Sequence, residues 1–399
     1  MKHIVIAGGG FAGIKLARKL RKQKDIRITL INDLEYFRYS PALYRAVTGF
    51  KIGIARLPIE WMLIDSDNVS VVIGRITDIN RANKELKLED GQKIDYDEVI
   101  FALGAANNYF GIEGLNEYSY GVKTVHDAIQ LKVHIHNSLT QKAKVADENF
   151  VIIGAGPTGV ELAGALGAYL IEVARKHKLK HHPVKIYLVE AGPRILPQMS
   201  EQASRKVSQR LAKLGVETLV NTAVQSETLS ELKTSVGMIK SKNVIWAAGT
   251  QNNPFFKEHP EVFSLNKRGY VIVNKHLQVS PDIYVCGDNA ATTYSGLAET
   301  AVRHANFIAK DIIARIHHTG RPKHYEKASM QVVPVGNRWS VFQYKTLVIS
   351  GGLISVIRRF ADIFGYTDVL GPIKALTIWA NSDRFEDDCP ICDKSQRYN

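Results

Sequence analysis

The chain carries the pattern Gly-x-Gly-x-x-Gly twice, and this repetition limits what it can fold into. Each copy follows an apolar run and opens a segment of small and apolar residues. The glycines are Gly8, Gly10 and Gly13 in the first copy and Gly154, Gly156 and Gly159 in the second. In a strand–turn–helix cradle for a dinucleotide, these glycines permit a tight turn, a close approach to the pyrophosphate, and close packing of helix on strand. One such pattern is a weak signal, but two in the same context predict two dinucleotide sites with electrons passing between them.

A polar residue ends the strand predicted after each cradle, where an acidic side chain is expected to hold a ribose diol. After the first cradle this place holds Asn32-Asp33. Asn32 is uncharged, so either Asp33 takes the role or the diol is held more weakly. After the second cradle the strand ends at Glu190, which would repel a 2′-phosphate and so favours NAD over NADP. Arg194 is the one feature that argues for NADP.

Three further stretches support a two-nucleotide plan. VIFALGAANN (99–108) and VIWAAGTQNN (244–253) resemble each other, and each predicts a strand that leaves one nucleotide fold and crosses to the next. The third, IYVCGDNA (283–290), predicts a strand that ends in Gly287-Asp288. An aspartate at this strand tip is well placed to bond a sugar-alcohol chain.

Composition narrows the class of protein. A chain of 399 residues accommodates two to three domains, and no apolar run is long enough to span a bilayer. The first strand begins at His3, which leaves no room for a secretory signal. The three cysteines exclude a disulfide framework and indicate a reducing compartment. The net charge of +13 suits an anionic membrane, nucleic acid or an acidic substrate, or serves solubility alone, and no nucleic-acid fold is recognisable.

Together these motifs resemble the two-dinucleotide-binding-domain flavoprotein family, and within it the type II NADH dehydrogenases (NADH:quinone oxidoreductases), over roughly residues 1–380. The resemblance implies an α/β fold with two Rossmann-like domains, one for FAD and one for the co-substrate NADH. The implied parts are a split FAD domain (1–115 and 265–330), an inserted NADH domain (116–264), and a C-terminal membrane-association region with a tail (331–399). The resemblance also implies a homodimer, peripheral on the cytoplasmic face of the cell membrane, with a membrane quinone as acceptor.

The resemblance transfers site residues onto this sequence. Candidate cofactor-binding residues are Gly8, Gly10, Phe11, Ala12, Gly13, Asn32, Asp33, Ala102, Gly104, Gly154, Gly156, Pro157, Thr158, Gly159, Glu190, Ala248, Gly249, Gly287, Asp288 and Ala301. Glu161, in GPTGVELAG, matches a family glutamate near the nicotinamide and flavin, and is the catalytic candidate. The alternative is a glutamate stabilised by the helix dipole. No metal site is expected.

The cysteine positions favour direct electron transfer. Several members of this fold relay electrons through thiols beside the flavin, but the region after the first cradle contains no cysteine. Cys286, in a predicted strand, is expected to be a small buried core residue. The resemblance therefore implies hydride transfer from NADH to flavin N5, followed by electron transfer to an external acceptor.

The acceptor motif departs from the family pattern. The family's AQxAxQ corresponds here to Ala298-Glu299-Thr300-Ala301-Val302-Arg303, so both glutamines are replaced. The candidate quinone residues are Ala298, Glu299, Val302 and Arg303. Glu299 and Arg303, four residues apart, either form a surface ion pair or reshape the site for a different acceptor.

Two amphipathic helices are predicted near the C-terminus. In the first, Ser355, Arg358, Arg359 and Asp362 form a polar face opposite apolar residues, and a second helix follows Gly371-Pro372. These helices fit an interfacial membrane anchor, or they pack on the protein's own core or on a second subunit. Cys389 and Cys392 lie in a tail predicted to be flexible, the alternatives being a zinc site shared between chains or a thiol pair.

Two other functions remain open at this stage. A soluble NADH oxidase or diaphorase would pass electrons to oxygen or to a carrier protein. The altered Glu299 and Arg303 favour this alternative, whereas the amphipathic C-terminus opposes it. A non-enzymatic flavoprotein would instead sense NADH and change its dimerisation.

Overall fold

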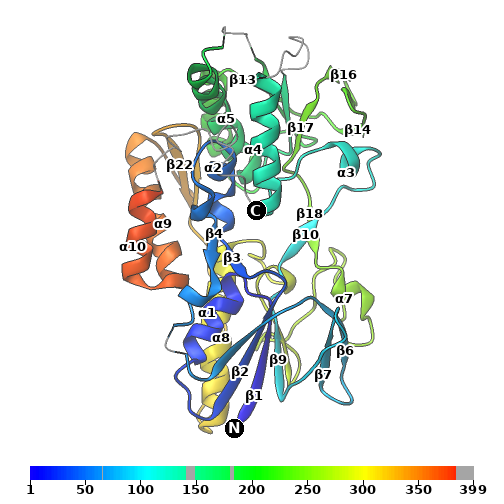
Figure 1. The fold of residues 1–399 in the computed structure, drawn as a ribbon, viewed down its shortest axis with the longest axis vertical. Helices are drawn as coiled ribbons and strands as arrows, with labels where there is room; N and C mark the ends of the chain where they lie inside the picture. The colour runs from blue at the N-terminus through cyan, green and yellow to red at the C-terminus, as the bar shows by residue number, and fades with distance from the viewer. Residues whose placement is uncertain (65, 141–148, 180–183, 383–399) are drawn as a thin grey trace.

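The computed structural model describes residues 1–64, 66–140, 149–179 and 184–382, and two α/β units are stacked along its long axis (Figure 1). The unit that holds the N-terminus contains a six-stranded sheet in the order β19-β20-β9-β1-β2-β5. All pairs in it are parallel except β19 with β20. Its strands are β1 (Lys2–Ala7), β2 (Ile26–Asn32), β5 (Val69–Ile73), β9 (Glu98–Phe101), β19 (Gln278–Ser280) and β20 (Ile283–Val285).

Strand β1 is an uninterrupted apolar run because both faces of its sheet are covered. Ile4 and Ile6 belong to the core that includes helices α1 (Phe11–Leu20) and α8 (Ala298–Ile316). Val5 and Ala7 belong to a second core with the antiparallel sheet of β6 (Ile76–Asn80), β7 (Glu85–Leu88) and β8 (Lys93–Asp95). The alternation of side chains along a strand therefore distributes β1 between two cores.

The second unit repeats this plan with a parallel sheet in the order β13-β12-β11-β17. Phe150 and Ile152 of β11 pack with helix α5, whereas Val151 and Ile153 face a separate cluster around Trp246. The strands are β11 (Phe150–Ile153), β12 (Ile186–Val189), β13 (Val216–Leu219) and β17 (Asn243–Trp246), with an antiparallel sheet of β14 (Val224–Glu227), β15 (Glu231–Thr234) and β16 (Gly237–Lys240). The helices of this unit are α3 (Leu115–Tyr118), α4 (Val125–Thr140), α5 (Pro157–Lys176) and α6 (Glu201–Lys213). Helix α7 (Phe255–Glu258) instead packs against Phe101 in the core of the first unit (Figure 1).

Two short strands join the units. β10 (Ala105–Asn107) follows β9, β18 (Thr250–Asn252) follows β17, and the two pair antiparallel in the waist of the molecule (Figure 1). The prediction that segments 99–108 and 244–253 cross from one fold to the other is confirmed. The carboxyl ends of β9 and β17 consequently face the same junction.

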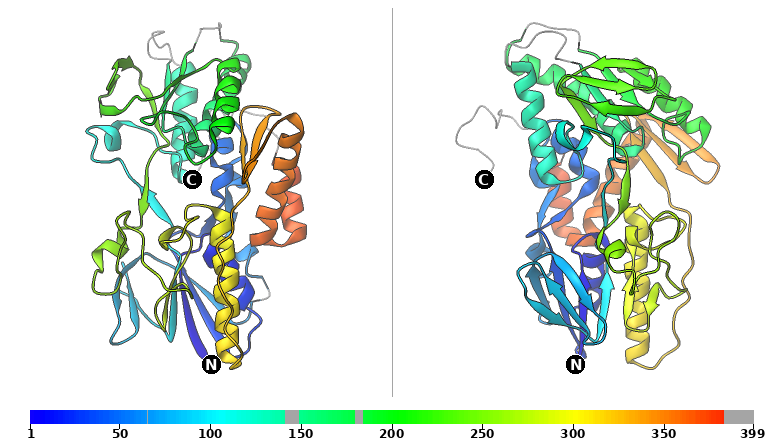
Figure 2. Two further views of the ribbon diagram at one scale, coloured as in Figure 1. Left: turned by 180° about the vertical axis from the view of Figure 1, so that it is seen from behind. Right: turned by 90° about the vertical axis from the view of Figure 1, so that its right-hand side faces the viewer.

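A third layer lies beside both units (Figures 1 and 2). It consists of an antiparallel sheet followed by two helices, and the strand pattern predicted over 333–344 is present as β21 and β22. Its elements are β21 (Gln331–Pro334), β22 (Ser340–Tyr344), β23 (Leu347–Gly351), α9 (Gly352–Leu370) and α10 (Pro372–Asn381). Across the described ranges, no helix combines the length and apolar character that crossing a membrane requires.

The segment after β2 connects this layer to the junction. It forms β3 (Tyr36–Arg38), α2 (Leu43–Val47) and β4 (Arg56–Pro58), with 3-10 turns at Ser40–Ala42, Ile52–Ile54 and Ile59–Trp61. Tyr39 stacks on Tyr366 of α9 with ring centroids 4.2 Å apart, and Tyr366 donates to the Ile54 carbonyl at 3.0 Å. Helix α9 is therefore fixed to the segment that borders both units.

Candidate active site

The first glycine cradle has a shape that only glycine permits at two of its three positions. Gly8 has φ of +108°, and a Cβ there would lie 2.3 Å from the Ala102 carbonyl oxygen. A Cβ on Gly13 would lie 1.8 Å from the Gly8 carbonyl oxygen. Gly10 has no neighbouring atom within 4 Å of the same position, so the space over the start of α1 is open.

The second cradle repeats this arrangement. Gly154 has φ of +98° and packs against Ala248, and a Cβ on Gly159 would lie 1.9 Å from the Gly154 carbonyl oxygen. The position of a Cβ on Gly156 is again open. Neither α1 nor α5 has a side-chain cap or an acidic residue in its first turn. Both N-termini therefore present unpaired N–H groups and a positive dipole end, which fit a dinucleotide diphosphate.

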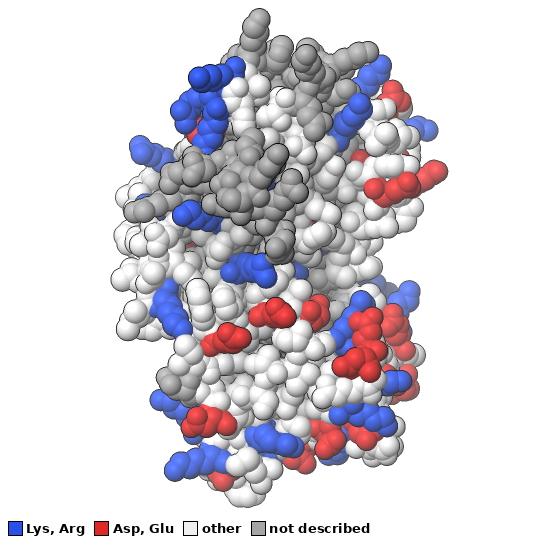
Figure 3. Space-filling view, viewed as in Figure 1, with Lys and Arg blue, Asp and Glu red and all other residues white. Residues whose placement is uncertain are grey.

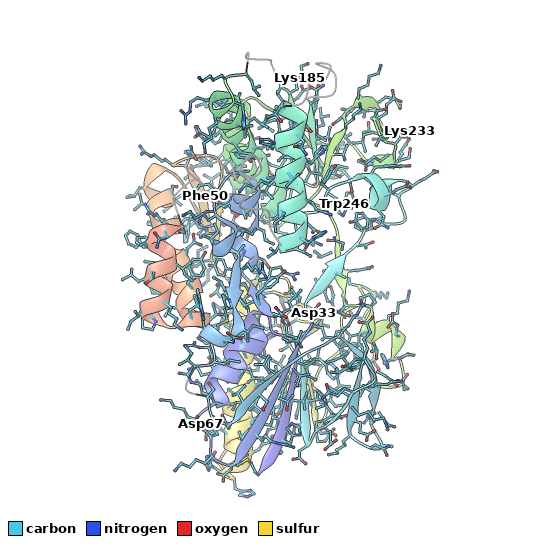
Figure 4. The ribbon with its side chains drawn as sticks, in the orientation of Figure 1. Asp33, Phe50, Asp67, Lys185, Lys233 and Trp246 are labelled. Carbon is cyan, nitrogen blue, oxygen red and sulfur yellow. The ribbon has the colours of Figure 1, made fainter. Side chains whose placement is uncertain are left out.

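The two residues predicted to hold ribose occupy equivalent places. The Asn32 Oδ1 accepts from the Gly9 N–H at 2.8 Å, and the Glu190 Oε2 accepts from the Ala155 N–H at 2.9 Å. Each side chain thus fixes its glycine turn. Asp33 is exposed just beyond β2, at the end of the sheet that faces the other unit (Figure 4).

Asn32 and Glu190 differ in how many hydrogen-bond acceptors they keep free for a ribose. Asn32 is buried, and its amide also donates to the Leu34 carbonyl at 2.6 Å. Glu190 is half-buried, and its other oxygen accepts from the Gly192 N–H at 2.8 Å. A carboxylate oxygen with one bond keeps a free lone pair, so Glu190 retains acceptors for two hydroxyls.

Arg194 is engaged within the protein. Its guanidinium donates to the carbonyls of Leu196, Pro197 and Met199 and to Ser204 Oγ, at 2.7 to 3.0 Å. Arg194, which would have favoured NADP, therefore stabilises the loop before α6.

The Gly287-Asp288 turn lies where the carboxyl ends of β1, β9 and β20 meet. Gly287 packs against Ala301 of α8, which is buried. Asp288 is half-buried, and burial raises the pKa of its carboxyl, while Gly296, Lys123 and Arg38 oppose that shift. Ligands of open α/β sheets bind at such an edge.

Three residues of this junction were not predicted from the sequence. Asn289 exchanges hydrogen bonds with the backbone of Gly104, at 3.1 and 2.8 Å, and so ties the turn to the waist. His304 Nδ1 accepts from the Gly287 N–H at 3.1 Å, and burial lowers the pKa of this histidine to about 4. Lys123 donates to the Gly249 carbonyl at 2.8 Å, and burial lowers its pKa to about 8. Only Asn289, adjacent to the Gly287-Asp288 motif, had a signal in the sequence.

Glu161 lies one turn into α5, in a cluster with α2 and α9. Burial raises the pKa of its carboxyl to about 8, Asp362 adds to this effect, and Arg358 and Arg45 oppose it. A glutamate held mainly by a helix dipole would show the opposite shift. The surroundings of Glu161 are therefore those of a carboxyl that can hold a proton near neutral pH.

The predicted ion pair of Glu299 and Arg303 is present on α8, with side chains 38% and 33% exposed. Arg303 also donates to the Lys327 carbonyl at 2.7 Å. Of their neighbours in the motif, Ala298 is exposed and Val302 is half-buried.

Cys286 is a core residue, as predicted. It is 1% exposed, its Sγ lies 3.6 Å from the Phe101 carbonyl oxygen, and burial raises its pKa to about 12. The thiol is thus protonated and inaccessible. Cys389 and Cys392 lie outside the described residues.

Two open cradles of the same design, facing one junction, define a protein of the two-dinucleotide-binding-domain class. The sequence profile described as pyridine nucleotide-disulphide oxidoreductase matches residues 2–305. Among solved structures, NDH2 from Plasmodium falciparum in complex with NADH superposes with a TM-score of 0.85 at 18% identity, over 95% of this chain and 97% of that one. The sulfide:quinone oxidoreductase of Aquifex aeolicus superposes with a TM-score of 0.79 at 20% identity, over 98% of both chains. At these identities, the superpositions establish the fold.

Sequence relatives narrow the family. Type II NADH:quinone oxidoreductase Ndh of Mycobacterium tuberculosis is 30% identical, over 96% of this chain and 89% of the relative. The type II NADH:quinone oxidoreductase of Staphylococcus aureus is 30% identical, over 78% of this chain and 82% of the relative. The chain therefore belongs to the pyridine nucleotide-disulphide oxidoreductase family and, within it, to the type II NADH:quinone oxidoreductases.

Proposed function

We propose that this chain is a flavoenzyme that oxidises NADH and reduces a quinone, with FAD in the first cradle and NADH in the second. The observation that carries the proposal is the pair of open helix N-termini at one junction. The described residues around this junction offer no exposed thiol, which favours direct transfer. In this proposal residues 1–115 and 265–330 serve FAD, 116–264 serve NADH, and 331–399 serve membrane association.

The residues divide the work of binding. The open spaces at Gly10 and Gly156 take the two diphosphates, and Glu190 takes the ribose of NADH, with discrimination against a 2′-phosphate. Asp288 takes the sugar-alcohol chain of FAD. When bound, FAD accepts a hydride from NADH and passes two electrons to the acceptor.

Glu161 supplies a proton. Reduction of a quinone to hydroquinone consumes two electrons and two protons, whereas NADH supplies two electrons and one proton as hydride. The remaining proton comes from solvent, and a carboxyl with a pKa of about 8 is suited to hold and donate it.

The acceptor site is proposed at the start of α8, with Ala298, Glu299, Val302 and Arg303. There the ion pair of Glu299 and Arg303 replaces two neutral glutamine side chains of the family motif. In this proposal, the quinone contacts the partly exposed ion pair of Glu299 and Arg303.

The outer face of α9 and α10 is proposed as the membrane contact. It carries exposed apolar side chains, among them Leu353, Phe364 and Ile373, which are 74 to 82% exposed. Trp61 and Ile64 of a neighbouring loop are also exposed, and Lys374 lies over the Trp61 ring. Figure 3 shows few charged side chains over α9 and α10, in contrast to the crowded charges around β6 and β7. An apolar face with basic residues nearby fits an anionic membrane, here the inner face of the cell membrane. The homodimer stays a prediction.

Anaerobic stopped-flow absorbance tests the proposed function. The FAD-loaded protein is reduced with one equivalent of NADH and mixed with a short-chain quinone or with oxygenated buffer. Reoxidation by quinone at least a hundredfold faster than by oxygen is expected. Faster reoxidation by oxygen would indicate an oxidase, and slow reoxidation by both acceptors would indicate a sensor or a carrier-protein reductase.

A further inference from the structure

Phe110 is an exposed aromatic residue in an unusual backbone conformation. Its φ is +53°, in a region that bulky residues rarely adopt, and the residue is 62% exposed. A left-handed backbone costs free energy at a residue with a Cβ, and an exposed ring gains little from burial. Neither property helps the chain to fold. Since strained residues cluster at sites that bind ligands, Phe110 is a candidate for such a role.

The ring of Phe110 is nevertheless held in a defined place. The Phe110 N–H donates to Asn108 Oδ1 at 2.8 Å, and the Asn108 N–H donates to the Gly249 carbonyl at 3.2 Å. The ring packs against Gly249, where a Cβ would lie 2.6 Å from Phe110 Cε2. It also lies edge-to-face with the Trp246 ring, the centroids being 6.2 Å apart. Phe110, which follows β10, is thus fixed on the segment that follows β17.

The sheet order indicates which part of a dinucleotide lies near this segment. In the order β13-β12-β11-β17, the second cradle follows β11, with Glu190 after β12 on one side and Gly249 beyond β17 on the other. In the proposed function, the diphosphate binds at the N-terminus of α5 and the adenosine ribose binds at Glu190. The nicotinamide half is therefore expected on the opposite side, toward the end of β17. That end contacts the cradle, since a Cβ on Gly154 would lie 2.5 Å from Ala248 Cβ.

We propose that Phe110 is a nicotinamide-binding residue, whose side chain contacts the nicotinamide ring of the dinucleotide. This inference rests on the proposed function. The nicotinamide ring is planar, and in NAD⁺ it is a cation, so an aromatic side chain suits both its shape and its charge. Contact with the ligand also removes from water the apolar surface that Phe110 exposes in the free protein.

Isothermal titration calorimetry of the FAD-loaded, oxidised protein with two probes tests this contact. NAD⁺ carries the nicotinamide ring, whereas ADP-ribose keeps the diphosphate and both riboses but lacks that ring. In Phe110→Gly, the affinity for NAD⁺ is expected to fall about tenfold, and the affinity for ADP-ribose is expected to stay within about twofold. Glycine accepts the positive φ, so the melting temperature should change by no more than about two degrees. Phe110→Tyr keeps the ring and should bind NAD⁺ with native affinity.

Lys84→Gly is the matched control. Lys84 has the same φ of +53° and lies between β6 and β7 of the first unit, so this variant should bind both probes with native affinity. In Phe110→Gly, native affinity for NAD⁺, or equal losses for NAD⁺ and ADP-ribose, would overturn the inference and leave the proposed function standing if quinone is still reduced. A selective loss of NAD⁺ affinity in a protein whose reduced flavin is not reoxidised by quinone would support the contact and reject the proposed function.

Discussion

Glu190 and Arg194 lie four residues apart. A carboxylate at this place favours NADH, whereas a guanidinium would favour the 2′-phosphate of NADPH. The carboxylate of Glu190 keeps acceptor capacity toward the cradle, whereas the guanidinium of Arg194 donates to the loop before α6 and to Ser204. A guanidinium that donates hydrogen bonds to three backbone carbonyls is not available to a 2′-phosphate. We therefore expect the discrimination between NADH and NADPH to depend on Glu190.

Arg194→Met is expected to lower stability without changing this discrimination. The substitution removes the donor from three carbonyls and a hydroxyl, at a cost of about 3 kcal/mol. Thermal melting should show a loss of several degrees, and the ratio of kcat/KM for NADH to that for NADPH should stay within twofold. A ratio that rises clearly toward NADH would show that Arg194 does contact the nucleotide.

Some properties of single residues can be predicted from the sequence, and others cannot. The glycine spacing predicted both cradles. The tight turn, the close approach of the diphosphate and the packing of helix on strand each require a residue without a Cβ, and this requirement is local in the sequence. The environment of Glu161 could not be predicted in the same way. Burial raises the pKa of its carboxyl, and Arg358 and Arg45 oppose that shift; the burial and both arginines come from distant segments that only the tertiary fold brings together.

At the scale of elements, the three glycines of a cradle have separable roles. A methyl group on Gly159 would collide with the backbone of Gly154, whereas a methyl group on Gly156 meets nothing in the protein. The third glycine thus serves packing of α5 on β11, and the second leaves an open space at the N-terminus of α5, where we propose that the diphosphate binds.

Paired alanine substitutions distinguish these roles. Gly156→Ala should keep the native melting temperature but bind NADH at least tenfold more weakly, a loss of about 1.4 kcal/mol or more. Gly159→Ala should lower the melting temperature, because the clash must displace α5. Titration with NADH and thermal melting of both variants provide the check. Native NADH affinity in Gly156→Ala would mean that the diphosphate lies elsewhere.

Helix α9 shows what a helical period does and does not predict. The spacing of Ser355, Arg358, Arg359 and Asp362 predicted a polar side and an apolar side. It could not predict that Arg358 and Asp362 face inward while Arg359 stays exposed, because that choice depends on the tertiary contact of Asp362 with Arg45 of α2. Among the residues that the structure describes, none covers the apolar side of α9, where Val356, Phe360 and Phe364 are exposed.

At the scale of the whole molecule, the net charge of +13 and the apolar face of α9 and α10 support one interpretation. In the membrane contact that we propose, the apolar side chains would supply the energy of insertion, and the positive charge would draw the protein to anionic lipid. A second copy of the chain is the competing occupant of the same face. The sequence alone left both open, since an amphipathic pattern is common to membrane anchors and subunit interfaces.

Phe364→Ser with Ile373→Ser separates these occupants. The two side chains are 74% and 82% exposed, and loss of about 2 kcal/mol for each should weaken binding to anionic vesicles on the order of a hundredfold or more. The control is Leu229→Ser with Val236→Ser. These side chains of the second unit are 71% and 70% exposed, and the double variant should bind vesicles normally. Vesicle sedimentation and sedimentation velocity are measured on both pairs. Native vesicle binding with a change from dimer to monomer would assign the face to a subunit interface, because a membrane-contacting face has no reason to alter the state of the protein in solution.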